Sequence, residues 1–301
     1  MQVYLPIAEI SVNIFAILAL GGLTGVLAGM FGVGGGFILT PLLIFIGISP
    51  AVAVATSANQ IIASSLSGFL AQARRGNVDF PMGNILLAGG MAGSTLGVVL
   101  FRWLKANGDI DLIISLAYVV FLTLVGGMMA SESVRAFLHK RKVIAAPHAP
   151  LQWRARLPWQ REFARSNIRV SLLLPLAVGA CVGLMVSFMG VGGGFFLVPA
   201  MIYLLGMPAS VVIGTSLYQI IFITSYVTLL QAITTQTVDI VLALLLLSAS
   251  VVGVHAGAKL GARLPASRLR GLLAGLVLLM ALKLAMGLFI PPENLFTVEA
   301  E

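Results

Sequence analysis

The sequence is short of charged residues. Its 301 residues include 18 Lys and Arg and 10 Asp and Glu, so only 9% are charged, against about 25% in soluble globular proteins. So few charges cannot cover a water-facing surface, which excludes a pair of soluble domains. Apolar residues make up 59% and recur in runs of about 20, the length of helix that spans the roughly 30 Å hydrocarbon layer of a bilayer. The composition therefore predicts a polytopic integral membrane protein.

Cysteine and catalytic groupings are lacking as well. The single cysteine, Cys181, excludes a disulfide framework, and its place in an apolar run predicts a buried thiol. No Lys or Arg precedes the first apolar run, so this run lacks the basic start of a signal peptide and is expected to stay in the mature protein. Nothing in the sequence resembles a metal site, a catalytic triad or an acid and base carboxylate pair. We therefore predict a protein that is not an enzyme and needs no metal and no cofactor.

Breaks at glycine, proline and polar residues divide the chain into ten apolar segments. They cover residues 12–31, 37–48, 50–73, 82–103 and 111–134, then 168–189, 195–206, 208–232, 239–262 and 268–290. The second segment of each half, at about 12 residues, is too short to span a bilayer as a regular helix. We expect an all-α fold with an N-terminal membrane repeat over 1–138, a basic loop over 139–167 and a C-terminal membrane repeat over 168–301.

The two halves repeat one another. The motif GVGGGFILTP at residues 32–41 returns 158 positions later as GVGGGFFLVP at residues 190–199, with eight of ten positions identical. The Thr-Ser pair at residues 56–57 likewise answers to the pair at residues 215–216. Duplication of whole halves is common among transporter folds.

The basic residues predict how the halves are oriented. Nine of the 18 Lys and Arg lie between Arg135 and Arg169, and basic loops stay on the cytoplasmic side of a membrane. Five crossings in each half gather 15 basic residues on the side of this loop and leave two on the other, whereas four crossings give 11 and six. We therefore predict two inverted repeats of about five apolar segments, with the central loop cytoplasmic and both termini outside. Re-entrant second segments would preserve the same sides.

The central loop carries Trp153, Trp159 and Phe163 among its arginines. This composition predicts a short amphipathic helix that lies on anionic lipid headgroups. Orientation in the membrane and contact with lipid then explain the net charge of +8. We therefore expect no nucleic acid as a partner. A simple orienting linker explains the same residues without a regulatory role.

The two Gly-Val-Gly-Gly-Gly motifs are the sharpest feature of the sequence. Irregular backbone is tolerated in hydrocarbon only where it lines a cavity or is buried in protein. A helix that resumes after each motif would point its first free N–H groups at the glycines, where an anion could approach closely. Tight packing of helices against small residues is the alternative. We predict helices broken at the motifs and an anion bound by Gly34, Gly35, Gly36, Gly192, Gly193 and Gly194.

Uncharged polar side chains follow each motif by one segment. Hydroxyls and amides can hydrogen-bond an oxyanion at a lower insertion cost than Lys or Arg. Spacings of three and four place each glutamine on the same helical face as a Thr-Ser pair. Hydrogen bonding between helices is the alternative use of such residues. The predicted substrate-binding set includes Thr56, Ser57, Gln60, Thr215, Ser216 and Gln219.

Three further residues could take part in binding or coupling. Asn59 and Tyr218 occupy equivalent positions in the repeat, and their difference could make the two half-sites unequal. His255 is the only histidine within an apolar segment, where it could carry a coupling proton or contact the anion. A packed, hydrogen-bonded neutral histidine is the alternative for His255.

Three remaining ionisable residues have structural interpretations. Asp79 and Asp239 each precede an apolar segment and are predicted to cap a helix N-terminus. Lys283 lies near the end of the last segment, where its long side chain can extend outward to the interface.

With these motifs, the chain resembles the sulfite exporter TauE/SafE family, also called the 4-toluene sulfonate uptake permease family. The two glycine motifs, the prolines Pro41 and Pro199 that follow them and the two Thr-Ser pairs carry the resemblance, which covers both apolar halves. It implies a permease of the bacterial cytoplasmic (inner) membrane. The implied cargo is sulfite, a sulfonate, sulfoacetate or another small sulfur-containing oxyanion, with coupling to protons.

These observations favour a secondary transporter whose two halves alternate access to an anion site near the midplane. Two other classes remain open. A passive anion channel could use the same N–H groups, and a membrane receptor or assembly subunit could use the basic loop.

Overall fold

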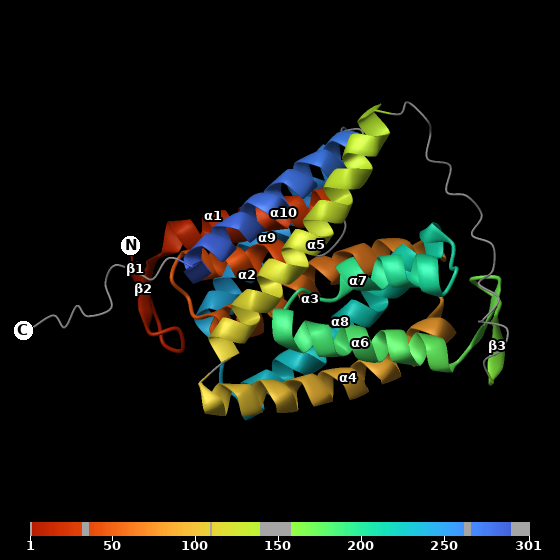
Figure 1. The fold of residues 1–301 in the computed structure, drawn as a ribbon, viewed down its shortest axis with the longest axis horizontal. Coiled ribbons are helices and arrows are strands. Elements are labelled where there is room, and N and C mark those ends of the chain that lie inside the picture. The colour runs from red at the N-terminus through yellow and green to blue at the C-terminus, as the bar shows by residue number, and fades with distance from the viewer. Residues whose placement is uncertain (1, 32–35, 109, 139–157, 262–265, 290–301) are drawn as a thin grey trace, which may run out of the picture.

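The computed structural model describes residues 2–31, 36–108, 110–138, 158–261 and 266–289. The elements of the first half are β1 (Gln2–Leu5), β2 (Ile10–Asn13), α1 (Ile14–Phe31), α2 (Gly36–Phe45), α3 (Pro50–Arg74), α4 (Phe80–Asn107) and α5 (Ile110–Leu138). Those of the second half are β3 (Gln160–Phe163), β4 (Ile168–Ser171), α6 (Leu173–Met189), α7 (Gly194–Pro199), the π-helical turn η2 (Ala200–Leu204), α8 (Ala209–Thr234), α9 (Ile240–Gly261) and α10 (Ala266–Phe289). Both halves therefore run through the same order, a hairpin, a long helix, a short helix and three more long helices (Figure 1).

The helices confirm the predicted all-α membrane class. Each of the ten predicted apolar segments is largely helical, and the short second segment of each half becomes α2 or the pair α7 and η2. Within the described ranges, five helical stretches are long and apolar enough to cross a membrane by length and composition. They are Phe80–Asn107, Ile110–Ser131, Ser210–Thr234, Ile240–Gly257 and Gly271–Leu288. The chain is thus a multi-pass membrane protein.

A β-hairpin opens each half, which the sequence does not predict. β1 pairs with β2 and β3 pairs with β4, both antiparallel. The second hairpin replaces the amphipathic helix expected in the central loop, as far as that loop is described. In β4 the exposed Arg169 stands between Ile168 and the buried Val170, the alternation of a strand rather than of a helix. Asn167 takes a left-handed conformation in the turn (φ 48°), which asparagine tolerates well.

The single cysteine is exposed, so the prediction of a buried thiol is wrong. α6 turns Val178, Gly179, Val182 and Gly183 toward the protein interior. Cys181 falls between these positions on the opposite face of the helix, which is exposed. A membrane helix can be apolar all round, so an apolar run does not reveal which of its faces meets protein.

The two halves are interleaved. α1 packs on α9, and α4 packs on α6, so the first long helix of each half lies against the third long helix of the other half (Figure 1). α3 packs on α8, and α5 packs on α10. Every one of these pairs joins the first half of the chain to the second.

Glycines bring the backbones of the paired helices into close contact. A Cβ atom at Gly93 in α4 would lie 2.0 Å from the carbonyl oxygen of Ala180 in α6. A Cβ at Gly257 in α9 would lie 2.0 Å from the carbonyl oxygen of Val26 in α1. Similar approaches to backbone oxygens, at 2.0 to 2.5 Å, hold for Gly25, Gly89, Gly179, Gly183 and Gly253. Much of the glycine surplus therefore lets α1 approach α9 and α4 approach α6, as expected for helix packing in membranes.

We predict that Gly93→Ala lowers the free energy of unfolding by about 1–3 kcal/mol, because the new methyl group forces α4 away from α6. Gly127→Ala in α5 is the matched control, since a Cβ there meets nothing within 4 Å. Thermal unfolding of both variants in detergent measures the difference. Equal melting temperatures would contradict close packing at Gly93.

Candidate functional site

The second glycine motif forms a series of left-handed turns between α6 and α7. α6 ends at Met189, and Gly190, Gly192 and Gly193 follow with φ values of 58°, 72° and 70°. Glycine adopts this region at no steric cost, whereas other residues lose about 1–2 kcal/mol. The helix restarts at Gly194. The backbone is thus irregular over the second motif inside a helical bundle.

The described part of the first motif lies against the second. Gly36 begins α2, and a Cβ on it would lie 2.9 Å from the carbonyl oxygen of Gly190. A Cβ on Gly190 would in turn lie 2.8 Å from the hydroxyl oxygen of Ser57 in α3. Gly34 and Gly35 lie outside the described residues. The fold therefore brings together Gly36, the second motif and one predicted hydroxyl group.

Backbone donors in the second motif are unpaired. The N–H groups of Gly192 and Gly193 donate to no acceptor among the described residues. A Cβ on Gly192 would lie 2.6 Å from Cγ2 of Ile61, and a Cβ on Gly193 would lie 2.4 Å from Cγ1 of Val182. The turn is therefore packed closely against apolar side chains, while the N–H groups of Gly192 and Gly193 stay unpaired within the described residues.

The two predicted threonines hold helix ends of the opposite half. The hydroxyl oxygen of Thr56 accepts a hydrogen bond from the N–H of Asp239 (3.2 Å), and that of Thr215 accepts one from the N–H of Asp79 (3.0 Å). Thr215 also donates to the carbonyl of Val211 (2.8 Å). Both threonines are fully buried. Each therefore has a protein partner across the interface between the halves.

Asp79 and Asp239 cap α4 and α9, as predicted. One carboxylate oxygen of each accepts from the N–H three residues further along, at 3.1 Å and 3.0 Å. The other oxygen of Asp79 accepts from the hydroxyl of Ser166 in the second hairpin (2.5 Å). The other oxygen of Asp239 accepts from the N–H of Ile7 in the first hairpin (3.0 Å). Each aspartate thus joins a helix start, a hairpin turn and, through its own N–H, a threonine of the opposite half.

The remaining short polar side chains bond within their own helices. Ser57, Ser216 and Asn59 each donate to the carbonyl three residues earlier, at 3.0, 3.0 and 3.3 Å. Ser57 also lies 2.7 Å from the hydroxyl oxygen of Thr40 in α2. Of these three predicted residues, Ser57 is the one that the structure places beside the second glycine motif.

Gln60 and Gln219 link neighbouring helices through their amide nitrogens. Nε2 of Gln60 donates to the hydroxyl of Thr24 in α1 (2.9 Å), and Nε2 of Gln219 donates to the carbonyl of Leu86 in α4 (3.2 Å). Both side chains are buried, and their carbonyl oxygens have no hydrogen-bond partner in the part of the chain that the structure describes. An unpaired buried acceptor is costly, so these two oxygens are notable features of the bundle.

Tyr218 lies at the edge of the helix bundle. Its hydroxyl donates to the side-chain oxygen of Asn84 in α4 (2.8 Å). Its ring packs with three phenylalanines, Phe69, Phe80 and Phe222. Tyr218 and Asn59 differ in these contacts, since Asn59 bonds within α3.

His255 is exposed and therefore not packed in the protein interior, although its ring makes the hydrogen bond that this alternative expects. Nδ1 of its ring lies 2.9 Å from the carbonyl of Val251 on the same helix. His255 stands on the outer face of α9, whereas Gly253 and Gly257 face α1. Lys283 is exposed too, with its ammonium group 4.4 Å from the centre of the ring of Phe45, as expected of a side chain that extends to the interface.

Sequence reasoning missed Tyr118 and Thr40. Tyr118 in α5 is fully buried, and its hydroxyl donates to the carbonyl of Met189, just before the second glycine motif. The repeat contains a signal for Thr40, because the equivalent position in the second half is Val198. Within the described ranges, no group of three His, Cys, Asp or Glu residues could hold a metal ion.

We predict that Thr215→Val lowers the free energy of unfolding by about 1–3 kcal/mol, because the buried N–H of Asp79 loses its acceptor. Thr224→Val is the matched control, since the buried hydroxyl of Thr224 bonds only within α8. Thermal unfolding of the two purified variants measures the effect. Equal destabilisation would show that the contact between Thr215 and Asp79 adds nothing.

The chain is similar to several probable membrane transporter proteins of bacteria. Probable membrane transporter protein YjnA of Bacillus subtilis (strain 168) is 30% identical over 270 residues, which cover 89% of this chain and 98% of that protein. Probable membrane transporter protein YunE of the same organism is 28% identical over 255 residues, 82% of this chain and 86% of that protein. A probable membrane transporter protein of Xylella fastidiosa (strain 9a5c) is 30% identical over 199 residues, 65% of this chain and 66% of that protein.

No solved structure matches the chain. The family described as "Sulfite exporter TauE/SafE" matches residues 17–284, which run from α1 to α10 and include both glycine motifs. The chain therefore belongs to the sulfite exporter TauE/SafE family of membrane transporters.

Proposed function

We propose that the protein is a secondary transporter that moves a small sulfur-containing oxyanion, such as sulfite, a sulfonate or sulfoacetate, across the bacterial cytoplasmic membrane. The observation that carries the proposal is the contact between Gly36 and the second glycine motif, next to backbone N–H groups that have no acceptor among the described residues. The family supports a sulfur oxyanion as the cargo. Coupling to protons would supply the driving force.

The N–H groups of Gly192, Gly193 and Gly194 are the donors that we assign to the anion, with those of the first motif as their counterparts. Neighbouring N–H groups in such turns form a concave arrangement that binds anions. Glycine has no side chain to keep an oxyanion from hydrogen-bond distance. Backbone dipoles also avoid the insertion cost of a Lys or Arg at membrane depth.

The predicted polar side chains divide by their contacts. Ser57 is our first candidate to bond an anion oxygen, because it lies beside the second motif. We assign Thr56 and Thr215 to holding the helix starts, since both accept from aspartate N–H groups. The free carbonyl oxygens of Gln60 and Gln219 can accept from a proton-bearing group, which fits a protonated oxyanion or a coupling proton.

The polar contacts tie the helices into two groups, each with members from both halves. Asp239 joins α9, the first hairpin and α3, and Gln60 joins α3 to α1. Asp79 joins α4, the second hairpin and α8, and Gln219 joins α8 to α4. We infer that these groups are the bodies that move during alternating access, with the α3–α8 contact between them. An inverted arrangement fits the two hairpins, which lie at opposite ends of the molecule (Figure 1).

The charges at the two ends support a cytoplasmic location of the second hairpin. Its end of the molecule carries five exposed arginines, Arg74, Arg75, Arg161, Arg165 and Arg169. The turn of the first hairpin carries the exposed Glu9 and no basic residue. Arginines on the cytoplasmic face would contact anionic headgroups, in line with the positive-inside rule.

Reconstitution tests the transport proposal. In proteoliposomes with an imposed proton gradient, the wild type is expected to accumulate labelled sulfite above its external concentration, and a protonophore is expected to abolish the accumulation. Equilibration without accumulation would identify a passive anion channel. A lack of any uptake of sulfite, sulfonates or sulfoacetate would contradict the proposed function.

Gly193→Ala tests the glycine turn. Alanine at φ 70° costs about 1–2 kcal/mol, and its methyl group would collide with Val182. We expect initial uptake to fall about tenfold or more, because the N–H groups no longer fit the anion. The amount of folded protein in the membrane is measured in parallel. Gly275→Ala is the matched control, since a Cβ there meets nothing within 4 Å; equal uptake by the two variants would remove the turn from the binding site.

Cysteine labelling tests the orientation. In a Cys181→Ser background, Glu9→Cys should react with a membrane-impermeant maleimide added to intact cells. Arg165→Cys should react only after the membrane is permeabilised. Labelling of both positions from the same side would contradict the inverted arrangement.

A further inference from the structure

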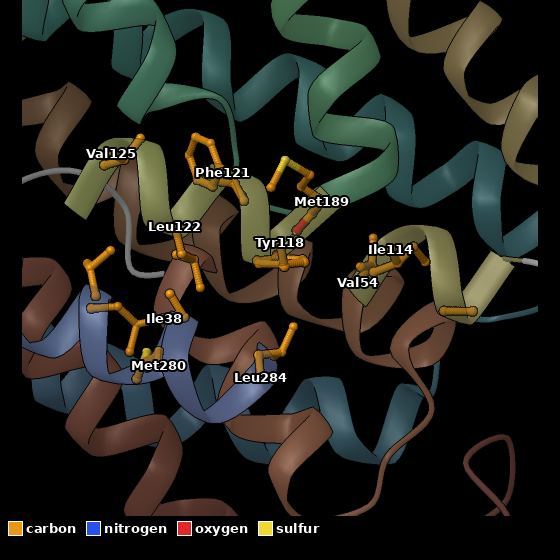
Figure 2. Close-up of a cluster of buried hydrophobic side chains, with 14 of the residues drawn as sticks. Ile38, Val54, Ile114, Tyr118, Phe121, Leu122, Val125, Met189, Met280 and Leu284 are labelled. Atoms are coloured by element: carbon orange, nitrogen blue, oxygen red, sulfur yellow. Dashed lines mark hydrogen bonds between the residues drawn. The ribbon is translucent and has the colours of Figure 1, made fainter. Parts of the chain in front are cut away.

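Tyr118 of α5 donates a hydrogen bond to the residue just before the second glycine motif. No other tyrosine among the described residues does so. The side chain of Tyr118 is completely buried and lies in an apolar cluster with Ile38, Val54 and Val191. Within this cluster the hydroxyl donates to the carbonyl of Met189 (Figure 2). A hydroxyl buried without a partner is destabilising, and a hydrogen bond in such a dry environment is strong.

Met189 is the point at which the helical backbone is interrupted. It is the last residue of α6, and the N–H of Gly190 closes the helix by donating to the carbonyl of Val186 (2.9 Å). The carbonyls of the last helical turn have no partner in their own helix. Tyr118 therefore supplies the missing donor immediately before the left-handed turn that carries the free N–H groups of Gly192 and Gly193.

Two more hydroxyls of the first half adjoin the same point. Tyr118 packs in one apolar cluster with Ile38 of α2, the helix that also carries Thr40. Thr40 lies 2.7 Å from Ser57 in α3, and Ser57 lies beside Gly190. Side chains from α2, α3 and α5 of the first half thus surround the interruption in the second half.

Among the described residues, the second half offers no equivalent cluster. Val198 replaces Thr40 in the repeat. α10 is the counterpart of α5 in the order of elements, and its residues Gly271–Leu288 include no Ser, Thr or Tyr. The hydroxyl cluster is therefore a specialisation of one half, and the repeated fold does not require it.

We propose that Tyr118 is a positioning residue that fixes the geometry of the second glycine turn from the first half of the chain. The proposal rests on the proposed role of that turn in anion binding. Without the bond, the carbonyl of Met189 is unpaired and the turn can rotate, so its N–H groups no longer share one direction. Tyr118 itself does not need to touch the anion.

Hydrogen exchange tests the assignment whether or not the protein transports sulfur oxyanions. The experiment compares full-length Tyr118→Phe with wild type in nanodiscs and follows the peptide that spans residues 186–196. We expect its amides to exchange about tenfold faster in the variant, since the turn loses its anchor. Tyr226→Phe is the matched control, because the hydroxyl of Tyr226 bonds to the exposed Thr95, away from the motif. An exchange rate in Tyr118→Phe equal to that of the control would overturn the proposal.

The KM for transport is a second measurement, and a purely structural role of Tyr118 would leave it unchanged. With sulfite as the probe, we expect Tyr118→Phe to raise the KM about fivefold or more while the maximal rate stays within about twofold. An unchanged KM would also overturn the proposal. Lack of transport by the wild type would contradict the proposed function instead, and hydrogen exchange would still decide the role of Tyr118.

Thr40→Val covers the case in which Tyr118→Phe fails to fold. It introduces the residue that the second half has at the equivalent position and removes the hydroxyl that bonds to Ser57. We expect faster exchange in the peptide spanning 186–196, by about threefold. Wild-type exchange in Thr40→Val would contradict the hydroxyl cluster as the anchor of the turn.

Discussion

Inside a bilayer, an unpaired backbone N–H or carbonyl costs several kcal/mol, because no water is present to replace a missing partner. This constraint explains the polar contacts at the helix ends. Two aspartates cap α4 and α9, Lys105 donates to the carbonyl of Thr235 at the end of α8 (2.7 Å), and Tyr118 donates to the last carbonyl of α6. Within the described ranges, the N–H groups of Gly192 and Gly193 stay unpaired, in contrast to these helix ends, and this contrast makes the glycine turn the candidate ligand site.

The same requirement that buried polar groups be paired makes the two halves depend on each other. The hydroxyl of Thr56 accepts a hydrogen bond from the N–H of Asp239, and the hydroxyl of Thr215 accepts one from the N–H of Asp79, in two nearly identical arrangements. The sequence repeat and the two groups of helices joined by polar contacts are therefore different divisions of the molecule. α1 and α9 belong together although about 210 residues separate them, whereas α3 and α4 are consecutive and belong to different groups.

Features that depend on one segment are predictable from the sequence, and features that depend on contacts between segments are not. The helices and the caps at Asp79 and Asp239 follow from local composition, and both are confirmed. The hairpins have strands of only four residues, too short for their alternation to be recognised in the sequence. The partners of Thr56 and Thr215 lie in the opposite half, so their spacing along a helix carries no information about them. Tyr118 is one tyrosine in an apolar helix until the fold brings it to Met189.

The interleaving of the halves also affects the synthesis and membrane insertion of the chain. α1 leaves the ribosome long before α9, and at about 5–20 residues per second the delay is roughly 10 to 40 s. During that time the glycine face of α1 meets lipid or an insertion factor instead of its final partner. The N-terminal half alone has no complete core, so a chain truncated after α5 would be a substrate for membrane proteases. The close packing of α1 on α9 can therefore form only late in synthesis, once the second half has been inserted.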